Sequence, residues 1–421
     1  MDNPQVVVIG AGASGMMSAI AAAQKGASVI ILEKKERPGR KIKITGKGRC
    51  NITNTKSWEE FSSHLHPNKR FLKKAFYSFS NIDTVKFFEE IGVKCVVERG
   101  DRVFPESGSA STVVDALQAR MDSLGIEQYY NSPVLRLEVA NNRIEKVVTR
   151  SRSYVPGVVI LATGGLSYPF TGSDGDGYEF AKSMGHSIVE CWPSLTALLP
   201  KNYSEELEGL TLKNIELSLY VGKDMVQIER GDIDFTNNGV EGSLGYRVSR
   251  KAVKALIYGN KCWLSINLKP SVPDSTLEAR IIEEIKQLNS SSTTALLRKF
   301  MPKQLIDSFL KDNNLPDSLS KIMDNYKFVM ELRESLKGWK MEIVSFTSYE
   351  RAVVTAGGIS LNEIYPKTMR SRVVENLFLS GEIIDLDGDT GGYNLQIAFS
   401  TGFKAGEESA AYLTLNSKTG V

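Results

Sequence analysis

The chain has 421 residues, of which 42% are hydrophobic and 24% charged, a composition typical of a soluble globular protein and not of a disordered or fibrous one. The 52 Lys and Arg residues nearly balance the 49 Asp and Glu residues, and a net charge of +3 gives no sign of a nucleic-acid or membrane partner. The four cysteines are too sparse for a disulfide framework, and the apolar runs are too short to span a membrane. With an apolar run beginning at Val6 and no leader pattern before it, we expect a cytoplasmic protein of two to three domains.

The first predicted unit is a strand, a glycine-rich turn and a helix. Residues 5–9 form an apolar β-branched run, which is followed by Gly10-Ala-Gly12-Ala-Ser-Gly15 and an alanine-rich stretch over 16–25. Gly10 permits a tight turn, Gly12 lets a pyrophosphate approach the backbone, and Gly15 lets the helix pack closely on the strand. We therefore expect phosphates at this helix N-terminus, with Ala13 and Ser14 among the residues that contact them.

A second predicted strand over 27–32 ends at Glu33, which lies 23 residues after Gly10. A carboxylate at this place accepts hydrogen bonds from the two ribose hydroxyls of an adenosine and repels a 2′-phosphate, which disfavours NADP at this site. The order of strand, turn, helix, strand and acid predicts a dinucleotide-binding domain.

A basic, glycine-containing segment follows over residues 34–51. Its glycines, Gly46 and Gly48, predict close approach of the backbone to a ligand, and Arg40 and Arg49 are suited to neutralise a diphosphate. A solvated basic loop or a nucleic-acid patch is the alternative. The segment resembles the extended contact that flavoproteins of the glutathione-reductase type make along FAD.

Three later motifs extend the resemblance to nearly the whole chain. An apolar run over 158–161 enters Ala162-Thr163-Gly164-Gly165, the segment 171–178 precedes a predicted helix, and residues 376–380 lead to Gly381-Glu382 and then to Gly391-Gly-Tyr-Asn-Leu-Gln396. Together with Arg49-Cys50-Asn51, these motifs resemble the BaiN/YhiN-type flavoproteins, often labelled aminoacetone-oxidase-like. The resemblance implies non-covalent FAD as the cofactor.

The resemblance also implies an α/β fold with a discontinuous Rossmann-like FAD-binding domain, an inserted small antiparallel β-barrel-like domain, and a helical insertion within that barrel. Short alternating runs between residues 196 and 268 read as antiparallel strands, and helical spacing of apolar residues begins near 274. We expect the FAD domain at 1–193 and 357–421, the barrel-like domain at 194–272 and 339–356, and the helical insertion at 273–338.

One segment departs from the family pattern. The family carries Phe-Thr-His-x-Gly-x-Ser-Gly-Pro in the middle domain, whereas this chain has Asn237 in place of the histidine and Glu241-Gly-Ser243 in place of Ser-Gly-Pro. Either a chemical role of that histidine is missing here, or the segment is a reshaped turn.

The predicted activity is hydride transfer between FAD and a small organic substrate, by reduction or desaturation of a carbon-carbon bond or by oxidation of an amine. The alternatives are an RNA-modifying flavoprotein and a non-catalytic FAD-binding protein. Because no second glycine fingerprint follows a strand, NAD(P)H is expected only as a transient donor. The helix beginning near Asn394 is expected to direct its positive end at the N1/O2 edge of the flavin.

The predicted cofactor-binding residues come from five segments of the chain, and no catalytic acid or base is assigned among them. They are Gly10, Gly12, Ala13, Ser14, Gly15, Glu33, Lys34, Arg40, Lys41, Gly46, Gly48, Arg49, Cys50, Asn51, Val134, Ala162, Thr163, Gly164, Gly381, Glu382, Asp385, Gly392, Tyr393, Asn394, Leu395 and Gln396.

No metal site is expected. The series Asp385-x-Asp387-x-Asp389 has the wrong residues at the sixth and twelfth positions of a calcium loop, and His64-x-His66 has no adjacent Cys or carboxylate pattern. We interpret His186 as a structural histidine and Cys50 as a packing residue.

Overall fold

The computed structural model describes residues 5–288, 291–319 and 325–419. The chain divides into two compact units, one formed by residues 1–193 and 352–421 and the other by residues 194–351. The predicted α/β fold class is confirmed, because the first unit contains a parallel sheet and the second a closed barrel. The three-part division stays a prediction: in the structure residues 352–356 group with the first unit, and the helical segment groups with the barrel.

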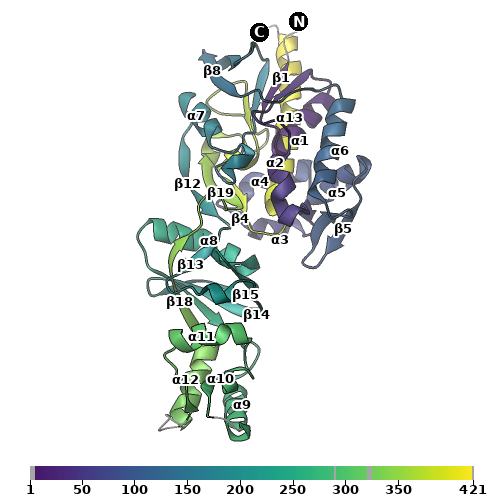
Figure 1. Cartoon of the computed structure of the whole chain (residues 1–421). Coiled ribbons are helices and arrows are strands. Elements are labelled where there is room, and N and C mark those ends of the chain that lie inside the picture. Colours follow the sequence, from purple (N-terminus) through teal and green to yellow (C-terminus); the bar gives the residue numbers. More distant parts are fainter. Residues whose placement is uncertain (1–4, 289–290, 320–324, 420–421) are drawn as a thin grey trace. The chain divides into compact units, whose positions relative to one another are not determined.

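A five-stranded parallel sheet organises the first unit (Figure 1). Its order is β20 (Leu377–Leu379), β11 (Val158–Leu161), β1 (Val6–Ile9), β2 (Val29–Leu32) and β7 (Glu127–Tyr129). In register, Val6 of β1 lies opposite Val158 of β11 and Val29 of β2. Every residue of the first four strands is buried, as expected for apolar strands of a parallel sheet that is covered on both faces.

Two long helices of this unit, α1 (Ala13–Gln24) and α13 (Tyr393–Thr419), pack against each other, and Figure 1 shows them side by side. A Cβ atom on Gly402 of α13 would lie 2.4 Å from the backbone oxygen of Ser14 in α1. One on Gly406 would lie 2.2 Å from the backbone oxygen of Ser18. Glycine at these two positions therefore lets the two backbones touch, which brings the C-terminal helix beside the N-terminal fingerprint.

Shorter elements complete the first unit. Its other helices are α2 (Arg40–Ile44), α3 (Trp58–Ser63), α4 (Lys69–Ser78), α5 (Asn81–Glu90), α6 (Ala110–Ser123) and α7 (Asp176–Ser183). Its smaller sheets are formed by β3 (Thr53–Asn54) with β6 (Arg102–Pro105) and β5 (Cys95–Glu98), by β8 (Val134–Ala140) with β9 (Arg143–Thr149) and β10 (Ser153–Tyr154), by β12 (Ile188–Ser194) with β19 (Val354–Ile359), and by β4 (Leu65–His66) with β21 (Asp387–Gly388).

The second unit is built on a closed antiparallel barrel. The strand order is β13 (Leu198–Pro200), β16 (Gly239–Glu241), β15 (Asp224–Thr236), β14 (Thr211–Val221), β17 (Cys262–Asn267) and β18 (Trp339–Phe346). Within residues 196–268, which the sequence analysis read as strands, the structure also contains a helix, α8 (Gly242–Ile257). Leu244, Val248 and Ala252 of α8 are buried at a spacing of four residues, the helical signal that the analysis missed.

Helices α9 (Asp274–Gln287), α10 (Thr293–Leu297), α11 (Lys303–Asp312) and α12 (Asn325–Lys337) form the predicted helical segment (Figure 1). Trp339 of β18 joins them to the barrel: its ring is fully buried against Phe309, with 6.0 Å between ring centroids. The indole N–H of Trp339 donates to Asp312 at 3.0 Å. Burial raises the pKa of that Asp312 carboxyl.

The segment that departs from the family pattern forms the connection from β15 to β16 and the start of α8. Asn237 lies in the turn, where the next residue, Asn238, donates its backbone N–H to Thr236 Oγ1 at 3.1 Å. Gly239 has φ of +116°, and a Cβ there would lie 2.3 Å from the backbone oxygen of Leu198. The turn is thus set by close packing on β13, which is consistent with the interpretation of a reshaped turn.

Candidate functional site

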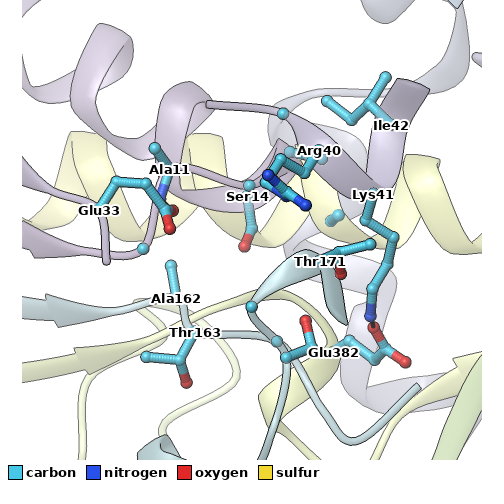
Figure 2. Close-up of a pocket in the computed structure, with 18 of the residues that line it drawn as sticks. Ala11, Ser14, Glu33, Arg40, Lys41, Ile42, Ala162, Thr163, Thr171 and Glu382 are labelled. Atoms are coloured by element: carbon cyan, nitrogen blue, oxygen red, sulfur yellow. Dashed lines mark hydrogen bonds and ion pairs between the residues drawn. The ribbon is translucent and has the colours of Figure 1, made fainter. Parts of the chain in front are cut away.

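The main pocket of the first unit opens at the carboxyl ends of its parallel strands. Residues that follow four of these strands line it. Gly10, Glu33 and Ala162 come directly after β1, β2 and β11, and Glu382 comes three residues after the end of β20. In open parallel sheets, ligands bind at this edge, where the chain leaves one strand to cross to another. Figure 2 shows Ala11, Glu33, Arg40, Lys41 and Glu382 around this pocket.

Two glycines of the first turn make the close backbone approaches that the sequence predicts. Gly10 has φ of +100°, and a Cβ there would lie 2.6 Å from the backbone oxygen of Ala162. A Cβ on Gly15 would lie 1.8 Å from the backbone oxygen of Gly10. Gly12 is different, because a Cβ there would meet no atom of the described chain within 4 Å. Gly12 is the N-cap of α1 and gives no side-chain hydrogen bond to that helix, so the first backbone N–H groups of α1 stay available to an anion.

Glu33 is held in place by two backbone N–H groups. Its Oε2 accepts from Ala11 N at 2.8 Å and its Oε1 accepts from Lys35 N at 2.8 Å. Burial raises the pKa of Glu33, and these two hydrogen bonds oppose that rise. A carboxylate oxygen has a second lone pair, so each oxygen can still accept from a ribose hydroxyl.

The basic residues of the pocket differ in what they offer a ligand. Lys34 is paired with Asp174 and, at 2.7 Å, with Asp176. Burial lowers the pKa of Lys34, but its hydrogen bonds to these two carboxylates outweigh burial and the pKa is raised. Arg40 pairs with Glu36, while its Nε is buried with no partner among the described residues. Of Lys34 and Arg40, it is therefore Arg40 that still has a hydrogen-bond donor for a phosphate.

A buried network surrounds Glu382. Lys41 Nζ lies 2.6 Å from Glu382 Oε2, and Ser167 Oγ and Thr355 N donate to Glu382 Oε1 at 2.5 and 2.8 Å. Burial alone raises the pKa of this carboxyl, but the charge of Lys41 and the three hydrogen bonds outweigh it, and the pKa of Glu382 is lowered. Glu382 is thus paired with Lys41 at the pocket wall (Figure 2).

Two observations test whether these residues fit a dinucleotide cofactor. The open Gly12 position at the uncapped start of α1 is a cradle for a pyrophosphate. The buried Arg40 Nε and Thr163 Oγ1 have no partner within the described chain, as expected of donors that await a ligand. With Glu33 at the ribose position, the pocket fits FAD.

One family model matches almost the whole chain: the model of the HI0933-like protein Rossmann domain matches residues 4–408. The chain belongs to the HI0933-like family. It is an FAD-dependent oxidoreductase. The alternative of a non-catalytic FAD-binding protein is therefore set aside.

The HI0933-like chain is similar to two curated proteins over nearly their full lengths. It is 30% identical to a 3-dehydro-bile acid delta(4,6)-reductase of Clostridium scindens, covering 96% of this chain and 99% of the relative. It is 28% identical to a ribosomal RNA dihydrouridine synthase of Escherichia coli, covering 98% and 99%. Among solved structures, 3-ketosteroid delta1-dehydrogenase from Sterolibacterium denitrificans shares the fold, with a TM-score of 0.55, 14% identity, and coverage of 98% of this chain and 100% of that one.

The structure brings most of the predicted cofactor residues to the pocket. Those that line it are Gly10, Gly12, Ala13, Ser14, Glu33, Lys34, Arg40, Lys41, Val134, Ala162, Thr163, Gly164, Glu382, Asn394 and Leu395. The other predicted residues lie outside its lining: Gly15, Gly46, Gly48, Arg49, Cys50, Asn51, Gly381, Asp385, Gly392, Tyr393 and Gln396. Contact of either group with FAD stays a prediction.

Arg49 and Cys50 have partners in the protein itself. Arg49 pairs with Glu98 and lies over the Phe104 ring at 4.3 Å. Cys50 is fully buried, and burial raises the pKa of its thiol to about 12. A buried thiol with so high a pKa is not a nucleophile at neutral pH, which agrees with the interpretation of Cys50 as a packing residue.

Two glycines in the later motifs, Gly357 and Gly392, lie in close contact with the backbone of another segment of the protein. A Cβ on Gly357 would lie 2.2 Å from the backbone oxygen of Glu190, and one on Gly392 would lie 2.4 Å from that of Thr53. Glycine at both positions is therefore explained by the packing of the protein itself, and contact of Gly392 with the cofactor stays a prediction.

The structure also joins residues that the sequence analysis treated separately. Asp389 accepts from His64 at 2.7 Å and from His66 at 3.1 Å, and His64 packs on the Tyr393 ring at 4.7 Å. Within the described residues no group of three or more His, Cys, Asp and Glu side chains is arranged to hold a metal ion. His186 is a structural histidine, as interpreted, with hydrogen bonds of 2.9 Å to both Glu363 and Ser371.

Several pocket residues were missed. Thr45, Ser132, Ser173, Val353 and Val354 line the pocket, and Ser167 and Thr355 hold Glu382 from nearby. The motif at 171–178 was a usable signal, because its Asp174 and Asp176 turn out to pair with Lys34. No helix in the described part of the chain is long and apolar enough to cross a membrane, and the cytoplasmic location stays a prediction.

Proposed function

We propose that this enzyme reduces a carbon-carbon double bond conjugated to a carbonyl group in a small organic substrate. The observation that carries the proposal is the similarity, over 96% of the chain, to a protein named as a 3-dehydro-bile acid delta(4,6)-reductase. The second curated relative is named for making dihydrouridine, which is uridine with one ring double bond reduced. Both names describe a reduction, which favours this reaction over amine oxidation.

In this reaction the protein's own residues bind and orient the cofactor and set the charge of the pocket wall. Bound FAD supplies the hydride chemistry. The N-terminus of α1, Arg40 and Glu33 bind the diphosphate and the ribose. Lys41 and Glu382 neutralise each other at the pocket wall, so that this wall presents a fixed dipole and no unpaired charge. Any nicotinamide donor binds transiently, because the sequence has no second dinucleotide fingerprint.

A test begins with the FAD-loaded protein, reduced under anaerobic conditions by NADH or NADPH while the flavin absorbance is followed. Steroid enones with double bonds at positions 4 and 6 are then added to the reduced protein. Saturated steroid ketones and an amine such as aminoacetone are added to separate samples of the oxidised protein, because only oxidised flavin can accept a hydride from them. The proposal expects flavin reoxidation and a product heavier by two hydrogen atoms only with the enones. Reoxidation by none of the enones, or turnover of the amine alone, would contradict it.

A second candidate substrate is a uracil ring within RNA. It is favoured by the 28% identity to ribosomal RNA dihydrouridine synthases from two organisms. The same reduced protein, mixed with unmodified ribosomal RNA and analysed for dihydrouridine by nucleoside mass spectrometry, separates the two candidates. The expectation of no nucleic-acid partner rests on the small net charge and on the use of the basic segment for a diphosphate, and the same experiment tests it.

A further inference from the structure

The first unit contains a second cavity, of about 560 Å³, between the C-terminal part of α13 and residues 365–372. Phe378 of β20 and Tyr412 of α13 line it from the protein core. Along the same helix, Ala398 lines the main pocket and Ala411 lines this one, thirteen residues further on. At 1.5 Å per residue, the two positions are about 20 Å apart, too far for a ligand seated here to exchange a hydride with one seated there.

Two arginines line this cavity with their guanidinium groups over tyrosine rings. The Arg372 guanidinium lies 4.0 Å from the centre of the Tyr365 ring. That of Arg370 lies 5.4 Å from Tyr365 and 5.5 Å from Tyr412. A guanidinium that lies over an aromatic ring keeps its N–H donors, and its planar fork can bind a phosphate through two parallel hydrogen bonds.

The cations of the cavity are not neutralised by the protein. Among the described residues, no carboxylate forms an ion pair with Lys367, Arg370 or Arg372, although Arg372 Nε makes a long contact of 3.4 Å to a backbone oxygen. The one acid that lines the cavity, Glu408, pairs with Lys404 of the same helix at 2.8 Å. Besides Thr368 and the paired Glu408, the rest of the lining is apolar or aromatic, and three cations around it favour an anionic ligand with a flat apolar part.

The turn that carries these cations is ordered by its own hydrogen bonds. Tyr365 N donates to Arg370 O at 2.9 Å, and Met369 N donates to Tyr365 O at 2.8 Å. Met369 is fully buried and has φ of +62°, a left-handed conformation uncommon outside glycine. Tyr412 is held from the other side, since its ring packs edge-on against Phe378 and its hydroxyl accepts from Arg143 at 3.3 Å. A ligand therefore meets cations and rings that are already positioned.

We propose that this cavity binds a nucleotide unit, with its phosphate on the Arg370 and Arg372 edges and its base against the tyrosine and aliphatic side chains. Stacking of bases on tyrosine and arginine, together with cations on the phosphate, is how proteins hold single nucleotides and unpaired strands. The unit is either a free nucleotide or part of an RNA strand. At about 20 Å from the main pocket, the site anchors its ligand and does not reduce it.

The test uses the FAD-saturated protein, so that the main pocket is occupied. Adenosine 5′-monophosphate, adenosine and a labelled single-stranded RNA of twelve nucleotides are titrated by calorimetry or fluorescence anisotropy at two salt concentrations. The double variant Arg370→Gln with Arg372→Gln is compared with a charge-matched control, Arg70→Gln with Arg99→Gln, at exposed positions outside the cavity. The variant with lysine at 370 and 372 keeps the charges and removes the planar fork.

The proposal expects the glutamine pair to weaken binding at least tenfold, the lysine pair to weaken it less, and the control to change it no more than twofold. Mononucleotide binding that needs the phosphate indicates a free nucleotide as the ligand. Binding of the RNA alone, with a shallower salt dependence in the glutamine pair, indicates a strand. If neither adenosine 5′-monophosphate nor the RNA binds, or if the control loses as much affinity as the glutamine pair, the proposal is wrong. FAD content and melting temperature show that each variant is folded.

Discussion

Lys41 Nζ lies 2.6 Å from Glu382 Oε2, and this ion pair joins two segments that are 341 residues apart in the chain. Lys41 belongs to α2, and Glu382 follows β20, the edge strand of the parallel sheet. Both side chains are about four-fifths buried, with exposed fractions of 21% and 19%. The pair therefore links the first and last parts of the cofactor domain at the wall of its main pocket.

The Lys41→Met variant should lose about 3 kcal/mol of unfolding free energy, because it leaves Glu382 charged and without its cation in a buried site. Glu382→Gln should cost less, since the amide oxygen still accepts from Ser167 and Thr355. The double variant should be more stable than the sum of the two losses predicts, by about 1 to 3 kcal/mol. Urea unfolding gives all three values. Additive losses, or a loss equal to that of the exposed control Lys146→Met, would contradict a coupled buried pair.

The Glu33→Ala variant should bind FAD at least tenfold more weakly, because a hydrogen bond to a charged group contributes about 1.5 to 3 kcal/mol. The same change removes the bonds from Ala11 and Lys35, so the melting temperature of the FAD-free protein must be measured beside the FAD dissociation constant. Glu106→Ala, at an exposed and weakly paired position, is the control. An unchanged dissociation constant in the Glu33 variant would remove this residue from the FAD site.

Asp389 should make stability depend on pH in the acid range. Burial raises the pKa of Asp389, but its hydrogen bonds from His64 and His66 outweigh burial and leave the pKa at about 2, against an ordinary 3.8. A lowered folded-state pKa means that the stabilisation, about 2 kcal/mol, is present above about pH 4 and is lost as the pH falls toward about 2. Unfolding free energies measured across this range should fall more steeply for the natural protein than for Asp389→Asn. Parallel curves, or the same change in the exposed control Asp101→Asn, would contradict this.

The start of α13 should favour negative charge on the bound flavin. Asn394 and Leu395 of its first turn line the main pocket, where the positive end of the helix stabilises an anion by about 0.3 to 2 kcal/mol. The two-electron reduced flavin should therefore be anionic at neutral pH, and the oxidised flavin should form a sulfite adduct. Gly392→Val should weaken both effects, because a side chain there collides with Thr53 and displaces the helix start. Gly338→Val, in the second unit, is the control. A neutral reduced flavin with no sulfite adduct in the natural protein would mean that α13 does not face the ring.

Short-range patterns were sufficient to predict the core of the cofactor domain. Gly10, Gly12 and Gly15 follow a β-branched strand and precede a helix, and Gly10 and Gly15 make the close backbone approaches that their spacing predicts. The signal is local, because sterics restrict which residues fit a tight turn and because a parallel strand needs apolar side chains on both faces. Alternating apolar residues predicted antiparallel strands in the second unit, and the family resemblance implied that they form a barrel. The helix α8 was not predicted, although its buried residues recur with a helical period.

Only the tertiary structure decided which partner each polar side chain takes. Arg40 and Arg49 are equivalent candidates for a diphosphate in the sequence, yet Arg40 lines the pocket while Arg49 pairs with Glu98. His64 and Asp389 were judged separately as poor metal ligands, and they bind each other across 325 residues. The cavity at Arg370 exists only because Tyr412 of the last helix packs beside it. Charge and hydrogen-bonding capacity are properties of one residue, but the group that satisfies them is chosen by how distant segments pack, and no short stretch of sequence contains that choice.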